Sequence, residues 1–338
     1  MIPIMQLLSL TKIVSDGAHN AFTGLAYFRN RYFLAFRQGE KHDSHDGNQI
    51  LLSSVDALEW NRQMETSFPT PEDLPPETPM DFRDCFFLNL GNELRLHSFA
   101  RTPLGPDETY LQPTRSTVQT TSDGMNWSAP RTILQGGLLW KPIIHEGRFF
   151  CAGYRRIPEE GIVVDLYQSP DGFVWERGSR IAPGNETILV PQSDGGLWAY
   201  VRTQDSLQHL QIWEAAAPGF TSWRLAGVIP KIIQAPQLVS VGRSRYLFGR
   251  EIPEHPEGAK SSPHLSRSKI WRLEGNQAHE VLELPSLGDT SYFGTVVCDD
   301  GTILASYYSQ HERESNKPES ERGGNDKPTD IFLARLRP

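Results

Sequence analysis

Short apolar segments separated by turn residues recur along this chain, and long amphipathic stretches typical of helices are absent. Six segments share one pattern, in which an apolar strand, a turn dipeptide and a second apolar strand follow one another. The turn dipeptides contain Gly or Asn, which tolerate the positive φ of a two-residue hairpin. The predicted hairpins cover residues 22–37, 84–101, 140–155, 186–202, 235–250 and 292–308.

The spacing of these hairpins, roughly 50 to 60 residues, leaves room for four strands in each unit. Six four-stranded units arranged in a circle predict an all-β fold, a six-bladed β-propeller, with residues 1–338 forming one domain. The last strand, near residues 330–337, is expected to close the ring by pairing with a strand around residues 7–14. The polar segment 310–328 is expected to be an exposed loop.

A second motif, Ser/Thr-x-Asp-x-x-x-Trp, lies between the hairpins. It occurs at residues 54–60, 121–127 and 169–175, with a degenerate copy at 217–223. The motif is the Asp-box, in which the aspartate caps the amides of its own turn and the tryptophan packs beneath it. These aspartates are therefore expected to be structural and not catalytic.

Composition excludes several classes of function. The chain has 338 residues and a net charge of -8 without a basic block, which disfavours nucleic-acid or membrane-surface partners. No apolar run is long enough for a transmembrane helix, and the first residues do not read as a signal peptide, so a cytoplasmic location is expected. Cys85, Cys151 and Cys298 lie far apart and form no zinc or disulfide pattern. No nucleotide, dinucleotide or metalloprotease motif occurs, so neither a cofactor nor a metal is predicted.

The ends of the hairpins predict where a site lies. Residues equally far from a turn lie side by side, so the start of each first strand meets the end of the second on one face of the channel. Five of the six second strands end in arginine: Arg37, Arg101, Arg155, Arg202 and Arg250. Guanidinium groups around a channel mouth favour a carboxylate, sulfate or phosphate ligand. Alternatively, these arginines pair with loop acids.

Two hairpins resemble those of the sialidase superfamily. The hairpin that contains Glu186 and Arg202 resembles the sialidase strand pair carrying a glutamate and one arginine of the carboxylate-binding triad. The hairpin that begins near Tyr292 resembles the pair that starts with the nucleophilic tyrosine. Together with the Asp-boxes, the resemblance covers nearly the whole chain and implies a sialidase-like propeller.

The segment 34–46 resembles the sialidase segment that carries the acid/base aspartate on a mobile loop. Asp46 is the first choice for this role and Asp43 the second. The loop also holds His42 and His45, which offer metal ligands, although four ligands within five residues do not easily converge on one ion.

The resemblance implies a retaining exo-glycosidase that hydrolyses a terminal acidic sugar, such as sialic acid or a related keto-acid sugar. The carboxylate on the anomeric carbon of such a sugar repels a carboxylate nucleophile, which explains the use of a neutral tyrosine. Tyr292 needs a base beside it, for which Glu186 is the candidate. Arg202 and Arg250 would hold the substrate carboxylate.

The sequence departs from the sialidase pattern at the first triad arginine, where it reads His19-Asn20-Ala21-Phe22. Arg37, on the neighbouring strand, is the candidate replacement. Four other residues at hairpin ends are expected to bind substrate: Asp84, Trp140, Arg155 and Tyr307.

Structural alternatives remain for these residues. Tyr292 would equally serve as a channel-lining aromatic bonded to Asp289, and Glu186 as a salt-bridge partner of Arg202. Trp140 would be either a sugar-stacking wall or buried packing, and Asp84 would bind a substrate hydroxyl or an arginine.

Two other functions remain compatible with the sequence. One is a propeller that binds acidic glycans without catalysis. The other is a polysaccharide lyase acting on uronates, with a Tyr or His base and an Arg that neutralises the carboxylate. The oligomeric state is not given by the sequence.

Overall fold

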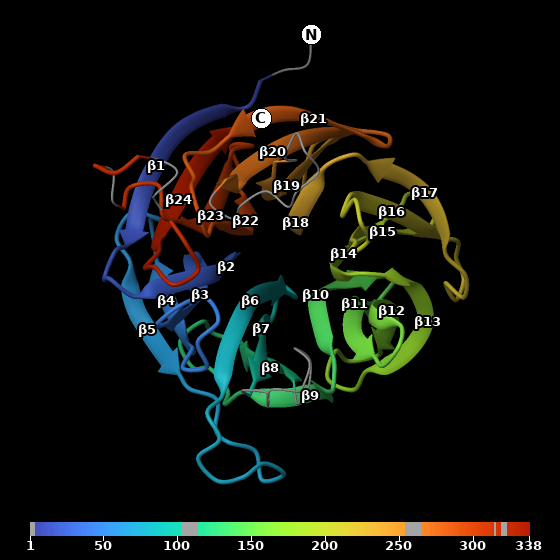
Figure 1. The fold of residues 1–338 in the computed structure, drawn as a ribbon, viewed down its shortest axis with the longest axis horizontal. Coiled ribbons are helices and arrows are strands. Elements are labelled where there is room, and N and C mark those ends of the chain that lie inside the picture. Colours follow the sequence, from blue (N-terminus) through green and yellow to red (C-terminus); the bar gives the residue numbers. More distant parts are fainter. Residues whose placement is uncertain (1–3, 103–113, 254–264, 314–315, 319–322) are drawn as a thin grey trace.

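The structure, a computed structural model, describes residues 4–102, 114–253, 265–313, 316–318 and 323–338. Within these ranges the chain forms 24 strands and no α-helix, so the described part contains no helix able to cross a membrane. The strands build six four-stranded antiparallel sheets that stand as blades around a central axis (Figure 1). The predicted six-bladed β-propeller is confirmed.

Each blade runs from an inner strand at the axis to an outer strand at the rim. The first blade contains β2 (His19–Phe28), β3 (Arg31–Gly39), β4 (Asn48–Ser54) and β5 (Asn61–Thr66). The second contains β6 (Asp81–Asn89), β7 (Leu94–Arg101), β8 (Arg115–Thr121) and β9 (Arg131–Gln135). The third contains β10 (Leu138–His145), β11 (Arg148–Ile157), β12 (Gly161–Ser169) and β13 (Glu176–Pro183).

The fourth blade contains β14 (Asn185–Pro191), β15 (Leu197–Arg202), β16 (Leu210–Ala215) and β17 (Arg224–Ile229). The fifth contains β18 (Ile232–Val241), β19 (Ser244–Ile252), β20 (Arg267–Glu274) and β21 (Gln277–Glu283). The sixth contains β22 (Ser291–Val297), β23 (Ile303–Ser309), β24 (Asp330–Arg337) and β1 (Gln6–Val14).

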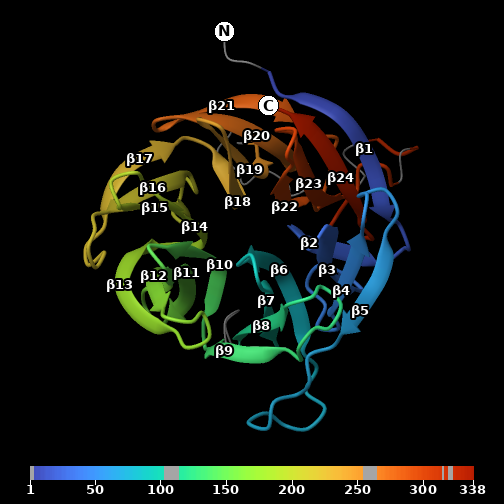
Figure 2. The ribbon, with the colours of Figure 1, turned by 180° about the vertical axis from the view of Figure 1, so that it is seen from behind.

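The sixth blade closes the ring by joining both ends of the chain. Strand β24 lies between β23 and β1, and its register with β1 runs from the pair Gln6–Arg337 to the pair Val14–Ile331. Figure 2 shows β1 on the rim beside β24 from the opposite side of the ring. The predicted closure is confirmed.

The segment 310–328 is exposed only in part. Residues 316–318 and 325–326 are exposed, but the ends of the segment fold inward. The Gln310 side chain is buried, where its Nε2 donates to the carbonyl oxygens of Gly324 and Lys327, and its Oε1 accepts from the Asp289 amide. The segment therefore packs against the polypeptide that leads into β22.

A β-bulge interrupts every inner strand at the same place. In each blade, two residues of the inner strand oppose one residue of the second strand, as in blade four, where the pairs Asn185–Arg202 and Ile188–Tyr200 flank the bulge. The first residue of each bulge has a positive φ between 33° and 60°, which is unfavourable for residues other than Gly, Asn and Asp. These six residues are Phe22, Asp84, Lys141, Glu186, Ala235 and Tyr292.

The three Ser/Thr-x-Asp-x-x-x-Trp segments form turns between the third and fourth strands of their blades. In each, the aspartate accepts hydrogen bonds from the amides two and three residues ahead; for Asp123 these are Met125 and Asn126, both at 2.8 Å. The aspartates cap their own turns, as predicted from the sequence.

Two glycines permit the inner strands of neighbouring blades to approach closely. A Cβ on Gly294 would lie 2.2 Å from the Leu25 amide nitrogen and 2.6 Å from the Gly24 carbonyl carbon. A Cβ on Gly24 would lie 2.5 Å from the Cys85 carbonyl oxygen. Because these contacts are with backbone, which cannot rotate away, a side chain at either position would push two blades apart.

We therefore expect Gly294→Ala to destabilise the fold by about 1–3 kcal/mol, the usual cost of overpacking. Denaturant unfolding measures the loss. Thr295→Ala, at the next and partly exposed position of β22, serves as the control and should change the unfolding free energy by less than about 1 kcal/mol. Equal stability of the two variants would contradict the close packing of blades one and six.

Candidate active site

A cavity of about 350 Å³ lies at the end of the ring where the inner strands begin. This volume falls within the roughly 300–1,000 Å³ typical of small-molecule sites. The ionisable and polar side chains that line it come from all six blades or their loops, and five are arginines. They are His42, Arg83, Asp84, Arg101, Thr114, Tyr154, Arg156, Asn185, Glu186, Arg202, Gln204, Arg250 and Tyr292.

Tyr292 and Glu186 meet inside this cavity although they are 106 residues apart. The Tyr292 hydroxyl donates to Glu186 Oε1 at 2.7 Å, and Arg202 Nη1 lies 2.5 Å from the same oxygen. The Ala235 amide donates to Glu186 Oε2 at 2.8 Å. Glu186, Ala235 and Tyr292 are all first residues of bulges, so the bulges aim these groups at one another.

The environment keeps the phenol neutral and the carboxyl ionised. Burial, reinforced by the Glu186 carboxylate, raises the pKa of Tyr292 well above its ordinary value. Burial alone would raise the pKa of Glu186, but Arg202 and the Tyr292 hydroxyl together lower it. A neutral phenol hydrogen-bonded to a carboxylate is the arrangement of a nucleophile and its base.

Arg202 and Arg250 both line the cavity beside this pair. The Arg250 guanidinium carbon lies 5.3 Å from the centre of the Tyr292 ring. Its Nη1 donates to Asp289 Oδ1 at 3.1 Å and its Nε to Gln234 Oε1 at 2.9 Å. Arg250 is thus anchored by two residues outside the cavity lining, whereas Arg202 is held by Glu186 within it.

Two buried oxygens on the cavity wall have no partner among the described residues: Asp84 Oδ1 and Asn185 Oδ1. Burial raises the pKa of Asp84 to about 6, against the opposing effect of Arg83, whose Nε lies 3.9 Å from Oδ2. Buried polar atoms are nearly always hydrogen-bonded. These two oxygens are therefore suited to accept hydrogen bonds from a ligand's hydroxyl or amide groups.

Arg37 lies outside the cavity, contrary to the expectation that it binds substrate. Its side chain is fully buried, and Nε donates to Asp81 Oδ1 at 2.6 Å. Asp81 also contacts Arg83 at 3.2 Å and Arg101 at 2.9 Å. Arg37 is therefore held by a carboxylate of the next blade, which the hairpin geometry could not reveal.

Three other expected binding residues also lie away from the cavity. Arg155 Nε pairs with Asp165 at 2.8 Å, an acid of the neighbouring strand β12 and not of a loop. Trp140 is packed among Phe86, Phe99 and Tyr154. The Tyr307 hydroxyl donates to the Pro285 carbonyl at 2.8 Å, on the face of β23 opposite to Tyr308.

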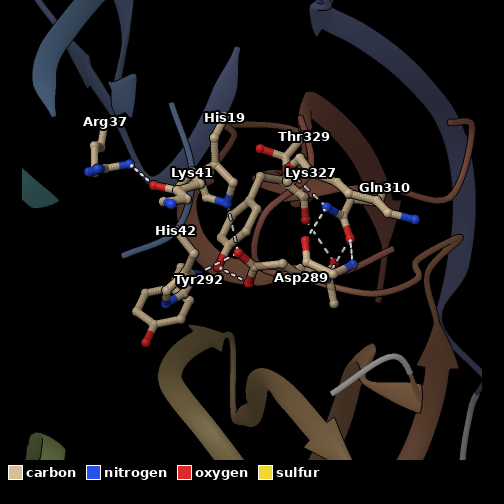
Figure 3. Close-up of polar contacts among 12 residues, drawn as sticks. His19, Arg37, Lys41, His42, Asp289, Tyr292, Gln310, Lys327 and Thr329 are labelled. Atoms are coloured by element: carbon tan, nitrogen blue, oxygen red, sulfur yellow. Dashed lines mark hydrogen bonds and ion pairs between the residues drawn. The ribbon is translucent and has the colours of Figure 1, made fainter. Parts of the chain in front are cut away.

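The loop between β3 and β4 brings a histidine to the cavity and not an aspartate. Asp46 is exposed and accepts from the Glu40 amide at 3.0 Å, and Asp43 is also exposed. Neither lines the cavity, whereas His42 does. His42 Nδ1 lies 2.5 Å from Asp289 Oδ2 (Figure 3).

Among the described residues, one group of side chains has ligand atoms close enough to share a metal ion: His19, His42 and Asp289. The remaining contacts do not favour a metal there. The Arg250 guanidinium lies 3.1 Å from the Asp289 carboxylate. The second ring nitrogen of His19, Nδ1, is buried and lacks the hydrogen-bond partner that usually orients a metal-binding imidazole. Asp289 already accepts from both histidines, Arg250 and the Tyr308 hydroxyl, so four hydrogen bonds occupy its two carboxylate oxygens.

Residues that the sequence did not single out as binding residues complete the cavity wall: Arg83, Tyr154, Arg156 and Asn185. Arg83 and Asn185 directly precede the bulge residues Asp84 and Glu186. Arg156 follows Arg155, which was predicted in its place. The extra residue of each bulge, which the hairpin pairing did not count, is the signal that could have found Arg83 and Asn185.

No model of a known protein family matches the sequence, and no curated protein is significantly similar to it. Several solved structures are similar in fold. A protein of unknown function from Dyadobacter fermentans has a TM-score of 0.74 at 18% identity, covering 99% of this chain and 100% of that one.

Trypanosoma rangeli sialidase, solved as a covalent intermediate with 2,3-difluorosialic acid, has a TM-score of 0.69 at 12% identity. The match covers 97% of this chain and 59% of the sialidase chain. Zg3597, a family 117 glycoside hydrolase of Zobellia galactanivorans, has a TM-score of 0.51 at 9% identity and covers 98% of this chain and 90% of that one. At these identities the likeness establishes the propeller fold alone.

The Arg37–Asp81 pair generates a prediction about stability. Although burial opposes ionisation, Arg83, Arg37 and Arg101 lower the pKa of Asp81 from 3.8 to about 2. A folded-state pKa below the unfolded one contributes stability that is present above pH 3.8 and is lost as the pH falls toward 2. Asp81→Asn should cost about 3–5 kcal/mol at neutral pH, because three cations lose a buried carboxylate.

Urea unfolding at neutral pH and below pH 4 measures this difference. Glu312→Gln is the control, because Glu312 pairs with Lys12 and both side chains are exposed, so the change should cost at most about 1 kcal/mol. A deficit of Asp81→Asn that stays constant across this pH range would contradict the role of the ionised carboxylate.

Proposed function

We propose that the protein is a retaining exo-glycosidase that removes a terminal acidic sugar, sialic acid or a related keto-acid sugar, with Tyr292 as nucleophile and Glu186 as its base. The observation that carries this proposal is the 2.7 Å hydrogen bond from the Tyr292 hydroxyl to Glu186 inside an arginine-lined cavity. The fold it shares with solved glycoside hydrolases supports the same class of reaction.

The chemistry of the substrate explains the residue types. A 2-keto acid sugar carries a carboxylate on its anomeric carbon, and Arg202 and Arg250 supply fixed guanidinium groups that attract it. Tyr292 Oη attacks the anomeric carbon as the glycosidic C–O bond breaks; its proton passes to Glu186 Oε1, and a general acid of the cavity protonates the leaving oxygen. Water then attacks the same carbon and gives a proton to the conjugate base of that acid, while the proton on Glu186 returns to the phenol oxygen as the bond between Tyr292 and the sugar breaks.

Asp84 and Asn185 fit the remainder of the sugar. Their unpartnered oxygens accept hydrogen bonds from hydroxyl groups, which distinguishes a polyol from a simple carboxylic acid. The group attached to the glycosidic oxygen would extend out of the cavity, as expected for an enzyme that acts on terminal sugars.

Tyr292→Phe should reduce hydrolysis of an aryl keto-acid glycoside, such as an aryl α-sialoside, below detection, because the variant has no nucleophile. Glu186→Gln should lower kcat by on the order of 10²–10⁴-fold, the usual contribution of a general base. The rates of both variants are measured by the release of the aryl alcohol. Tyr200→Phe is the matched control, because Tyr200 is buried outside the cavity and its hydroxyl has no partner among the described residues. Full turnover by Tyr292→Phe would remove Tyr292 from the mechanism.

A 2,3-difluoro keto-acid sugar should label the protein covalently, because fluorine beside the anomeric carbon slows breakdown of the intermediate. Intact-protein mass spectrometry should show one added sugar, and peptide mapping should place it on Tyr292, with no label in Tyr292→Phe. Binding of the free sugar without label or turnover would instead indicate a non-catalytic glycan-binding propeller. A product that absorbs in the ultraviolet would indicate a lyase.

A further inference from the structure

The loop from residue 40 to residue 47 is held rigidly at the edge of the cavity. Arg37, itself fixed by Asp81, donates from Nη1 to the Lys41 carbonyl at 3.1 Å and from Nη2 to the Ser44 carbonyl at 2.9 Å. The His42 amide donates to the Asn325 carbonyl at 2.8 Å. The position of His42 is therefore set by buried contacts on both sides.

One nitrogen of the His42 imidazole is committed to a buried carboxylate. Its Nδ1 lies 2.5 Å from Asp289 Oδ2, and Asp289 is itself fixed by Arg250, Tyr308, His19 and the Gln310 side chain (Figure 3). An ionised carboxylate only accepts hydrogen bonds, so the proton of the neutral imidazole is on Nδ1. This tautomer leaves Nε2 able to accept or deliver a proton.

The His42 side chain lines the same cavity as Tyr292 and Glu186. It is 14% exposed, and its Nε2 has no partner among the described residues. Its ring packs edge-on against Phe22, 5.2 Å between centroids. Asp46, by contrast, is 54% exposed, accepts from the Glu40 amide and does not line the cavity.

We propose that His42, oriented by Asp289, is the group that protonates the leaving oxygen and later activates water in this cavity. The inference rests on the proposed function. In the first step the imidazolium Nε2–H passes its proton to the glycosidic oxygen as the C–O bond to the leaving group breaks. In the second step neutral Nε2 takes a proton from water as the water oxygen bonds to the anomeric carbon and Tyr292 departs, which restores both groups.

The surrounding charges set the pH range in which His42 can act as an acid. Burial and Arg83 lower the pKa of His42 below its ordinary value of 6.5, against the opposing effect of Asp289 and Asp43. His19 shares Asp289 Oδ2 with His42, and Arg250 and Tyr308 occupy the other oxygen. The imidazolium therefore becomes abundant only below pH 6.5, so hydrolysis of poor leaving groups should increase as the pH falls below that value, until Glu186 protonates.

The test is how the rate of hydrolysis depends on the leaving group of the substrate. His42→Asn, whose amide can still donate to Asp289, should slow hydrolysis of an alkyl keto-acid glycoside by about 10²–10⁴-fold. For a nitrophenyl glycoside, whose leaving group needs no proton, formation of the tyrosyl intermediate should change by less than about tenfold in a single-turnover measurement. Added azide should restore steady-state turnover of the nitrophenyl substrate by replacing water.

Two variants measured in parallel make the result specific. His45→Asn, on the same loop but outside the cavity, should retain wild-type rates on both substrates. If Asp84→Asn and not His42→Asn shows the leaving-group dependence, the acid is Asp84 and the proposal is wrong. Equal rate losses of folded His42→Asn on both substrates would also overturn it. A wild-type protein inactive on both glycosides would overturn the proposed function itself.

Discussion

The β-bulge at the start of every inner strand is the constraint on which the site depends. In a regular strand, successive side chains point alternately to the two faces of the sheet. By inserting one extra residue, each bulge interrupts this alternation and leaves its first residue with a positive φ. Four of these residues reach the cavity or its Glu186 with a side chain or an amide: Asp84, Glu186, Ala235 and Tyr292. Backbone strain of this kind typically costs about 1–3 kcal/mol per residue and persists only where surrounding packing maintains it. Here it is repeated six times, and three of the six residues carry ionisable oxygen groups: Asp84, Glu186 and Tyr292.

Electrostatic pairing behind the cavity fixes the groups that face it. Asp81 holds three arginines, and Asp289 holds Arg250 together with two histidines. These carboxylates are buried and remain ionised because the cations around them offset the cost of burial. The guanidinium groups are thereby positioned before any ligand arrives, and fixed dipoles and charges stabilise a developing charge more than mobile ones do.

The sequence predicted the fold well because each blade repeats its own local information. Turn dipeptides and apolar strands specify the hairpins, and their spacing gives the number of blades. The site was harder to predict. Tyr292, Glu186, Arg202 and Arg250 reach the cavity because each lies at or beside a bulge in its own hairpin.

Three physical causes place predicted site residues outside the cavity. Arg37 and Arg155 are held by acids outside their own hairpins, Asp81 in the next blade and Asp165 in the third strand. Tyr307 lies on the opposite face of β23 from Tyr308, and a shift of one residue decides which face a strand residue occupies. The exposure of Asp46 depends on how its loop meets residue 325, which is 279 positions away and therefore has no local sequence signal.

The pairing of β24 between β23 and β1 also determines when the cavity forms during synthesis. Blades one to five consist of consecutive segments and can assemble as they emerge from the ribosome. The sixth blade needs residues 330–337 to bridge β23 and β1, and Tyr292 lies on its inner strand. A nascent chain that lacks β24 therefore holds an incomplete ring with an open edge at β1, and the cavity that joins Tyr292 to Glu186 forms only when β24 is in place.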